Sequence, residues 1–180
     1  MIFTETKLNG AFIVEPERFE DERGFFALSW SRKEFAARGL DSELAECNIS
    51  FNKQKGTVRG MHYQQPPYGQ TKLVRCTGGA IYDVIIDLRP MSATFKCWAG
   101  VELTESNHLM LYVPKDFAHG FQTLQDNTEV FYQMSTPYSP ESGRGLRWND
   151  PAFGIEWPES TGVIMNERDQ AYTDFGTDLN

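Results

Sequence analysis

About ten short runs of β-branched and aromatic residues follow one another along the chain, separated by turns that contain Gly, Pro, Asn and Asp. Many short strand-like runs of this kind are typical of a sandwich or barrel. We therefore predict an all-β fold. The stretch 137–157 is rich in Pro, Gly and Asp and is predicted to be largely loop. The strands are expected at 12–14, 24–30, 44–51, 57–64, 71–76, 80–88, 95–103, 109–113, 117–124 and 129–135.

A helix is predicted over residues 32–38. Ser31 and Glu34 match a capping box, and Gly39 supplies a stop. One or two short helices do not change the all-β class. With 180 residues, the chain fits one domain, 1–180. Its C-terminal segment, about 158–180, is expected to pack over the barrel.

Charge and composition exclude several classes of protein. The net charge of −8 repels nucleic acid, so a phosphate-bearing ligand needs a local basic site. No stretch approaches the roughly 20 apolar residues of a membrane span, and no targeting pattern opens the sequence, so we expect a cytoplasmic location. Cys47, Cys76 and Cys97 are far apart in apolar segments and are predicted to be buried thiols.

Two histidines and a lysine stand in strand-like contexts that suggest chemistry. His62 lies in the run RGMHYQ, and His119 lies in PKDFAHGF. Alternation places Lys72 on the same strand face as apolar neighbours, where it must snorkel to the rim or meet a charge. Asp83 likewise alternates with isoleucines, and a carboxylate on an apolar face needs a partner, for which a histidine is the economical candidate. Each histidine alone could equally be a core imidazole.

Two histidines also raise the possibility of a metal. Metal-binding barrels of the cupin type present His-x-His with a further carboxylate and histidine. Here Gln64 follows two residues after His62, and Lys72 stands where a carboxylate would be wanted. Without a metal, an imidazole and a buried cation are what proton abstraction beside a carbonyl requires. Tyr132 could donate a proton from the opposite side, although a strand tyrosine is more often packing. We therefore expect no metal and no cofactor.

Several motifs, in the expected order and spacing, resemble the dTDP-4-dehydrorhamnose 3,5-epimerase family from about residue 10 to residue 169. Each motif would be weak alone, and together they are strong. They are residues 21–26 (DERGFF), 59–64 (RGMHYQ), 72–75 (KLVR), 82–84 (YDV) with 87–89 (DLR), 114–121 (PKDFAHGF), 147–151 (RWNDP) and 166–169 (NERD).

The resemblance implies a cupin-like jelly roll that acts as a metal-free homodimer. The family inverts stereocentres beside the C4 ketone of a nucleotide-linked 4-keto-6-deoxysugar, with dTDP as the expected nucleotide. His62 resembles the general base and Asp169 its carboxylate orienter. Tyr132 resembles the proton donor, and Lys72 would stabilise the enolate. The implied substrate-binding residues are Arg23, Phe26, Asn48, Arg59, Gln64, His119, Tyr138 and Arg168, with Asp83 behind His119.

Three departures from the family pattern touch contacts to the substrate. Leu28 and Gly143 stand where the rhamnose enzymes have glutamate, and Glu46-Cys47-Asn48 stands for Gln-Asp-Asn. They leave open whether C3 alone or both C3 and C5 are inverted, and on which nucleotide sugar. A 3,4-ketoisomerase, a non-catalytic sugar-nucleotide-binding cupin and a metal-dependent cupin remain as alternatives.

Overall fold

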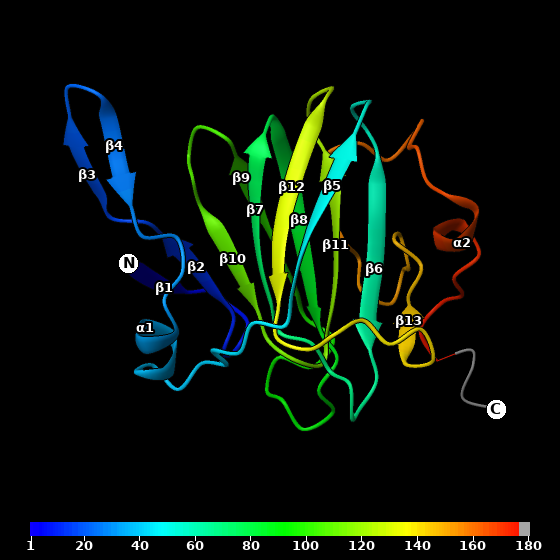
Figure 1. Cartoon of the computed structure of the whole chain (residues 1–180). Coiled ribbons are helices and arrows are strands. Elements are labelled where there is room, and N and C mark those ends of the chain that lie inside the picture. Colours follow the sequence, from blue (N-terminus) through cyan, green and yellow to red (C-terminus); the bar gives the residue numbers. More distant parts are fainter. Residues whose placement is uncertain (177–180) are drawn as a thin grey trace.

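Two antiparallel sheets face each other in the computed structural model, which describes residues 1–176 (Figure 1). The six-stranded sheet has the order β1 (Ile2–Glu5), β2 (Phe12–Glu15), β10 (Met110–Val113), β7 (Lys72–Gly78), β12 (Thr128–Met134) and β5 (Glu46–Asn52). The five-stranded sheet has the order β13 (Gly143–Gly145), β6 (Val58–Gln64), β11 (Phe117–Thr123), β8 (Ala80–Asp87) and β9 (Trp98–Thr104). A separate hairpin, β3 (Arg18–Asp21) and β4 (Gly24–Ala27), extends away from both sheets.

Strand alternation places one row of side chains from each sheet in the space between the sheets. Val74 and Cys76 of β7 pack in one cluster with Ile81 and Ile85 of β8, and with Phe121 of β11. All five are less than 5% exposed. Burying one such side chain stabilises the fold by about 1.5–3 kcal/mol, so this layer is the main source of cohesion between the sheets.

The outer faces of the sheets are covered differently. Met61, Val84 and Ile86 point away from the other sheet and pack against Leu146 and Phe153 of the long connection after β13. The six-stranded sheet is covered at one end by the short helix α1 (Arg32–Ala36), whose Phe35 packs against residues of β7 and β10. The rest of that outer face carries exposed apolar side chains on β5.

The predicted helix is confirmed, although it is shorter than expected. The side chain of Ser31 accepts a hydrogen bond from the backbone N–H of Glu34, which satisfies one of the free donors at the helix start. The helix ends at Ala36, and Gly39 has a φ of +69°, a left-handed conformation that suits glycine. In the described part of the chain, no helix is long and apolar enough to cross a membrane.

Every predicted strand range overlaps an observed strand, and three strands were missed. β1 and β3 are short edge elements without clear signals, and β13 lies in the stretch 137–157 that we predicted to be largely loop. One prediction was wrong for two of the three cysteines. Cys76 is buried, but Cys47 and Cys97 are exposed. Cys47 lies on the outer face of β5 beside the exposed Ile49, so its apolar neighbours do not indicate burial.

The chain returns to the five-stranded sheet after a long excursion. Ile164 forms a parallel bridge with Thr57, and its carbonyl accepts a hydrogen bond of 2.8 Å from the N–H of Val58. The second helix, α2 (Glu167–Gln170), follows directly and contacts β6. We call residues 164–176 the C-terminal strap. Residues 177–180 of the predicted covering segment lie outside the described residues.

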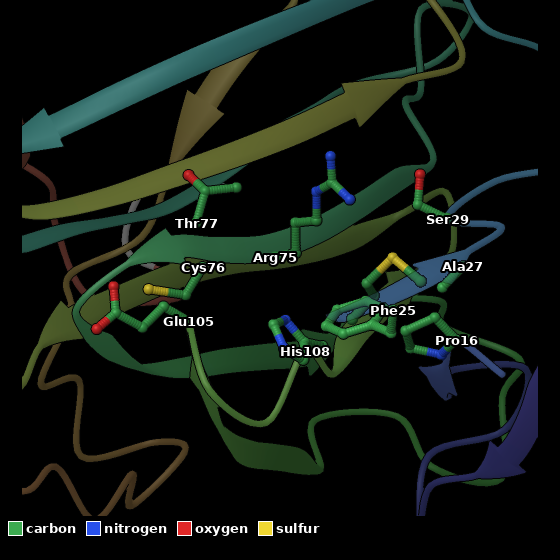
Figure 2. Close-up of a pocket in the computed structure, with 10 residues that line it drawn as sticks. Pro16, Phe25, Ala27, Ser29, Arg75, Cys76, Thr77, Glu105 and His108 are labelled. Atoms are coloured by element: carbon green, nitrogen blue, oxygen red, sulfur yellow. The ribbon is translucent and has the colours of Figure 1, made fainter. Parts of the chain in front are cut away.

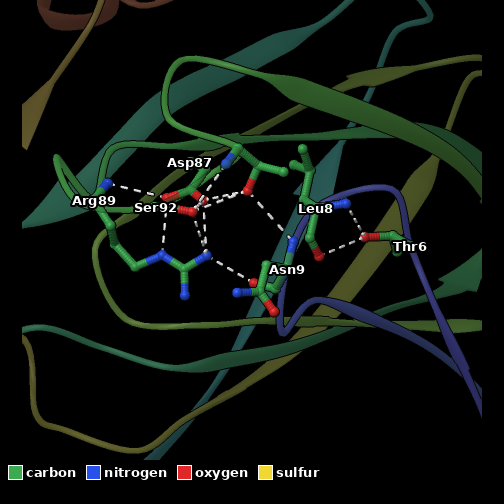
Figure 3. A network of polar contacts seen from close by, with 7 residues as sticks. Thr6, Leu8, Asn9, Asp87, Arg89 and Ser92 are labelled. Atoms are coloured by element: carbon green, nitrogen blue, oxygen red, sulfur yellow. Dashed lines mark hydrogen bonds and ion pairs between the residues drawn. The ribbon is translucent and has the colours of Figure 1, made fainter.

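A buried carboxylate fixes the turn between β1 and β2 against the loop that leads to β9 (Figure 3). Asp87 is fully buried and accepts hydrogen bonds from Arg89, Ser92 and Thr94. Arg89 also donates to the backbone carbonyl of Asn9 at 2.7 Å. Burial alone would raise the pKa of Asp87, but these donors outweigh it and lower the pKa.

Candidate active site

The C-terminal strap brings Asp169 into contact with His62, although the two residues are more than 100 positions apart in the sequence. The Nε2 atom of His62 lies 2.8 Å from Oδ1 of Asp169, and the N–H of Gly60 donates to Oδ2 at 3.2 Å. Burial would raise the pKa of Asp169, but the hydrogen bond with His62 and the Gly60 N–H lower it overall. The carboxylate is therefore charged at neutral pH, and it orients an imidazole whose side chain remains 39% exposed.

A second histidine–carboxylate pair lies next to the first. His119 is the Cα partner of His62 in the β6–β11 pairing, and its Nε2 lies 2.7 Å from Oδ1 of Asp83. The predicted histidine partner of Asp83 is thus found. Burial lowers the pKa of His119, so this imidazole is neutral at pH 7. The second oxygen of Asp83, Oδ2, is buried and has no hydrogen-bond partner within residues 1–176.

Lys72 supplies a positive charge to the same interior. Alternation along β7 was predicted to place it with Val74 and Cys76, and both belong to the core between the sheets. Burial lowers the pKa of Lys72 from 10.5 to about 8, and the charge of Asp83 acts in the opposite direction. The ammonium group is therefore mostly protonated at pH 7. A cation that is largely shielded from water is well suited to stabilise a developing oxyanion.

Tyr132 reaches the same cavity from β12. Burial raises the pKa of its hydroxyl, against the opposing charge of Arg59, so the phenol is protonated at neutral pH. The cavity has a volume of about 210 Å³. Its lining combines one imidazole, one ammonium group and three phenols with other polar residues. The lining residues are Asn48, His62, Tyr63, Gln64, Gln70, Lys72, Tyr132, Met134, Tyr138, Gly143, Arg144 and Arg168.

Cationic side chains gather at this cavity although the chain carries a net charge of −8. Arg144 and Arg168 line it together with Lys72. Arg168 Nη1 lies 3.4 Å from the hydroxyl of Tyr138, which places a guanidinium beside an exposed aromatic ring. Arg59 lies on β6 and donates to Asn52 at 2.7 Å. A local cationic site of this kind is what the sequence required for a phosphate-bearing ligand.

Four predicted substrate-binding residues do not line the cavity of their own chain: Arg59 and His119, which lie on β6 and β11, and Arg23 and Phe26. Arg23 and Phe26 lie on the projecting β3–β4 hairpin (Figure 1). The guanidinium of Arg23 binds Asp21 on the same hairpin, and Phe26 is 74% exposed. Gln64 lines the cavity, but its amide donates to the carbonyls of Tyr68 and Pro137 and accepts from the N–H of Ser139. Gln64 thus holds the loop that carries Tyr138.

Four lining residues were missed by sequence reasoning: Tyr63, Gln70, Met134 and Arg144. Gln70 lies in a turn, and its amide donates to the carbonyl of Thr136, so only the fold reveals its place. Tyr63 directly follows His62, and strict alternation along β6 argued against both residues reaching one cavity. Arg144 lies in β13, which had been assigned to loop.

A separate cavity of about 280 Å³ lies between the hairpin and strands β7 and β10 (Figure 2). Its lining includes Phe25, Cys76, Glu105 and His108, and none of the predicted site residues. Burial raises the pKa of the Cys76 thiol to about 11, so the thiolate that nucleophilic chemistry needs is absent at pH 7. Across residues 1–176, no group of three or more His, Cys, Asp or Glu side chains is arranged to hold a metal ion.

Comparisons with known proteins agree with this geometry. Residues 5–176 match the family described as dTDP-4-dehydrorhamnose 3,5-epimerase. An enzyme of that name from Sinorhizobium fredii is 42% identical over 171 residues, which cover 95% of this chain and 88% of the relative.

Solved structures agree equally well. The dTDP-4-dehydrorhamnose 3,5-epimerase of Elizabethkingia anophelis has a TM-score of 0.94 at 37% identity and covers 97% of this chain and 96% of its own. That of Bacillus anthracis, solved with TDP and PPi bound, has a TM-score of 0.91 at 42% identity, with coverages of 95% and 97%. The predicted cupin-like fold is confirmed by this likeness. The chain therefore belongs to the dTDP-4-dehydrorhamnose 3,5-epimerase family.

Proposed function

We propose that this protein is an epimerase that inverts C3 and C5 of a dTDP-linked 4-keto-6-deoxyhexose in deoxysugar biosynthesis. The observation that carries the proposal is the convergence of His62 with its Asp169, Lys72 and Tyr132 on one cavity. The four groups supply a base, an orienter, a cation and an acid. Family membership supports the same reaction, which proceeds through an enolate and uses no metal.

His62 acts as the base in this proposal. Asp169 engages Nε2, and the other ring nitrogen takes the proton from the carbon beside the ketone. The electron pair of the broken C–H bond moves into the carbonyl and leaves a negative charge on the C4 oxygen. The ammonium group of Lys72 stabilises that charge, and the buried setting strengthens the attraction because it excludes water.

Tyr132 completes the inversion from the other face. Its hydroxyl gives a proton to the enolate carbon, so a new C–H bond forms on the side opposite His62, and the enolate electrons return to that bond. The phenolate then regains a proton from solvent, and the imidazolium of His62 releases to solvent the proton that it took. Asn48 and the neutral His119 contribute polar contacts to the sugar in this scheme, and Asp83 holds His119 in place.

The nucleotide end of the substrate would lie at the cationic rim. Arg59 and Arg168 offer guanidinium groups to the diphosphate, and Tyr138 offers a ring for stacking on the base. Arg23 and Phe26 join this subsite only if a second chain delivers them. We therefore include a homodimer in the proposal, in which the projecting hairpin of one chain reaches the cavity of its partner.

Exposed apolar side chains support the homodimer. Ile49 is 65% exposed and Phe51 is 52% exposed on the outer face of β5, and Phe25 and Phe26 are exposed on the hairpin. Apolar surface of this extent commonly marks an interface.

Analytical ultracentrifugation should find a dimer, and I49K/F51K should dissociate it and lower turnover. A monomeric wild-type protein would remove the homodimer from the proposal. A cytoplasmic location, expected from the sequence, belongs to the same proposal.

Exchange in deuterated water tests the reaction. Incubation with dTDP-4-keto-6-deoxyglucose should place deuterium at C3 and C5, as read by NMR of the product. Deuterium at C3 alone would make the protein a C3-only epimerase, and a product whose ketone has moved would make it a ketoisomerase. His62→Ala should abolish exchange, whereas His108→Ala, at the separate cavity, should retain it. If the wild-type protein catalyses no exchange with any of the nucleotide 4-ketosugars tested, the proposal is overturned.

A further inference from the structure

We propose that Tyr172 is a positioning residue that fixes the imidazole of His62 for proton transfer. The inference rests on the proposed function, because it takes His62 as the base. Tyr172 follows α2 in the C-terminal strap, three residues after Asp169. Its ring lies edge-to-face against the His62 ring, with a centroid separation of 5.9 Å and an interplanar angle of 72°. Tyr172 does not line the cavity, so it acts through His62.

A glycine provides the space for this ring. Gly145 of β13 is the Cα partner of His62 in the β6–β13 pairing. A Cβ at Gly145 would lie 2.1 Å from Cε2 and Cζ of Tyr172, far inside van der Waals contact. The backbone of Gly145 is not left-handed, so the position needs a small residue for room rather than for conformational freedom. The bare strand surface beside His62 is therefore filled by Tyr172.

Asp169 and Tyr172 restrain the imidazole in different ways. A hydrogen bond to Nε2 holds one atom of the ring but still permits the ring to swing about that atom. Contact with an aromatic face or edge blocks such a swing, because the rings cannot interpenetrate. Since the His62 side chain is 39% exposed toward the cavity, the second restraint matters there. Both restraints come from the same strap, whose helix start is capped by Asn166.

The ring of Tyr172, rather than its hydroxyl, does the positioning. The hydroxyl oxygen is buried, and no hydrogen bond of ordinary geometry reaches it from residues 1–176, although the guanidinium of Arg168 lies near it. Burial raises its pKa against the nearby charge of Arg168, so it remains protonated at neutral pH. A phenylalanine at this position would keep the ring contact with His62 and remove only the hydroxyl and its contact with Arg168.

Four variants, each assayed by exchange in deuterated water, test the inference. Tyr172→Leu should lower kcat on the order of tenfold, because small misplacements of reacting groups are costly, and should leave KM and dTDP affinity within about twofold. Tyr172→Phe should restore most of the lost kcat. Phe175→Leu is the matched control. Phe175 lies in the same strap and its ring contacts that of Phe153, so the variant loses a comparable ring contact without affecting one to His62.

Gly145→Ala should displace Tyr172 and give the same kinetic defect without altering either ring. Combined with Tyr172→Leu it should add little further loss, because both changes act through one contact. Equal kcat in the wild-type protein and in folded Tyr172→Leu would overturn the inference, as would a Phe175→Leu defect of the same size. Equal loss in Tyr172→Phe would also overturn it. Failure of the proposed function looks different, because the wild-type protein itself would then not exchange.

Discussion

His62 and His119 face each other as Cα partners on β6 and β11, and each imidazole binds its own buried carboxylate. The two pairs have similar geometry but different exposure. The His62 side chain is 39% exposed, whereas that of His119 is 9% exposed. Burial keeps His119 neutral, and only His62 combines a carboxylate partner with a side chain open to a ligand. This difference is the physical basis for assigning the two histidines to separate tasks.

Asp169→Asn should lower kcat by about 10²–10⁴-fold, because an amide cannot hold the imidazole in the required tautomer or stabilise its charged form. KM should change much less. Exchange assays in deuterated water, quenched at timed intervals, measure kcat and KM. Asp150→Asn serves as the control, since Asp150 is also buried and its carboxylate accepts from the backbone N–H groups of Ala152 and Phe175. A kcat for Asp169→Asn near that of the wild-type protein would contradict the assigned role.

Turnover should fall as pH rises through about 8, because Lys72 loses its proton there. The pKa is lowered from 10.5, so the ammonium form, which stabilises the enolate, is present below pH 8 and lost above it. A kcat profile from pH 6 to 10 gives the midpoint. A profile that stays flat to pH 10 would show that the charge of Lys72 is not needed.

Lys72→Met should stabilise the fold while it abolishes exchange. A half-buried lysine whose pKa is lowered from 10.5 to about 8 costs the folded state up to about 3 kcal/mol when protonated. The unfolded chain binds the proton more tightly, so the stability of the wild-type protein should rise between pH 8 and 10.5. Urea unfolding at pH 7 and pH 10 tests both points. A variant less stable than the wild-type protein at pH 7 would refute the estimate.

Tyr132→Phe should separate exchange from inversion. Without the acid, His62 can still remove a proton and return a deuteron to the same face, so deuterium enters the substrate while its configuration is retained. Epimerised product should fall at least about 10²-fold, in keeping with the loss of one general acid. NMR distinguishes retained from inverted material. Equal loss of exchange and inversion would place Tyr132 elsewhere in the reaction.

Asp87→Asn should destabilise the fold without touching the site. Removing one charge of a buried pair costs about 3 kcal/mol, and here Arg89 would lose its partner. Because the folded pKa of Asp87 is lowered, its contribution is present above pH 4 and lost as pH falls through the folded value. Acid and urea unfolding measure it. Asp21→Asn, on the exposed hairpin, should change stability far less.

Sequence reasoning identified the strands and the reacting groups but not the distances between the reacting groups. Alternation was enough to place Lys72 and Asp83 inside, because a two-residue period is a local property of a strand. The pairing of His62 with Asp169 came only through family resemblance, since nothing local joins two residues so far apart. The sequence did not show what the Gln64 amide binds, and it did not single out Tyr172. The first depends on which backbone groups surround its amide, and the second on a gap left by Gly145.

The C-terminal strap also sets the order in which the proposed site comes into being during translation. Every strand of both sheets ends by Gly145, whereas Asp169 and Tyr172 leave the ribosome later. A nascent chain could therefore complete its sheets, with Lys72 and Tyr132 already inside, before the carboxylate that orients His62 has been synthesised. Such a chain would contain the cation and the acid, but it would lack the orienter of the base and the guanidinium of Arg168. A single proteolytic cut between Gly154 and Ile164 would threaten turnover in the same way, since it would leave the strands intact while freeing the residues that direct the base.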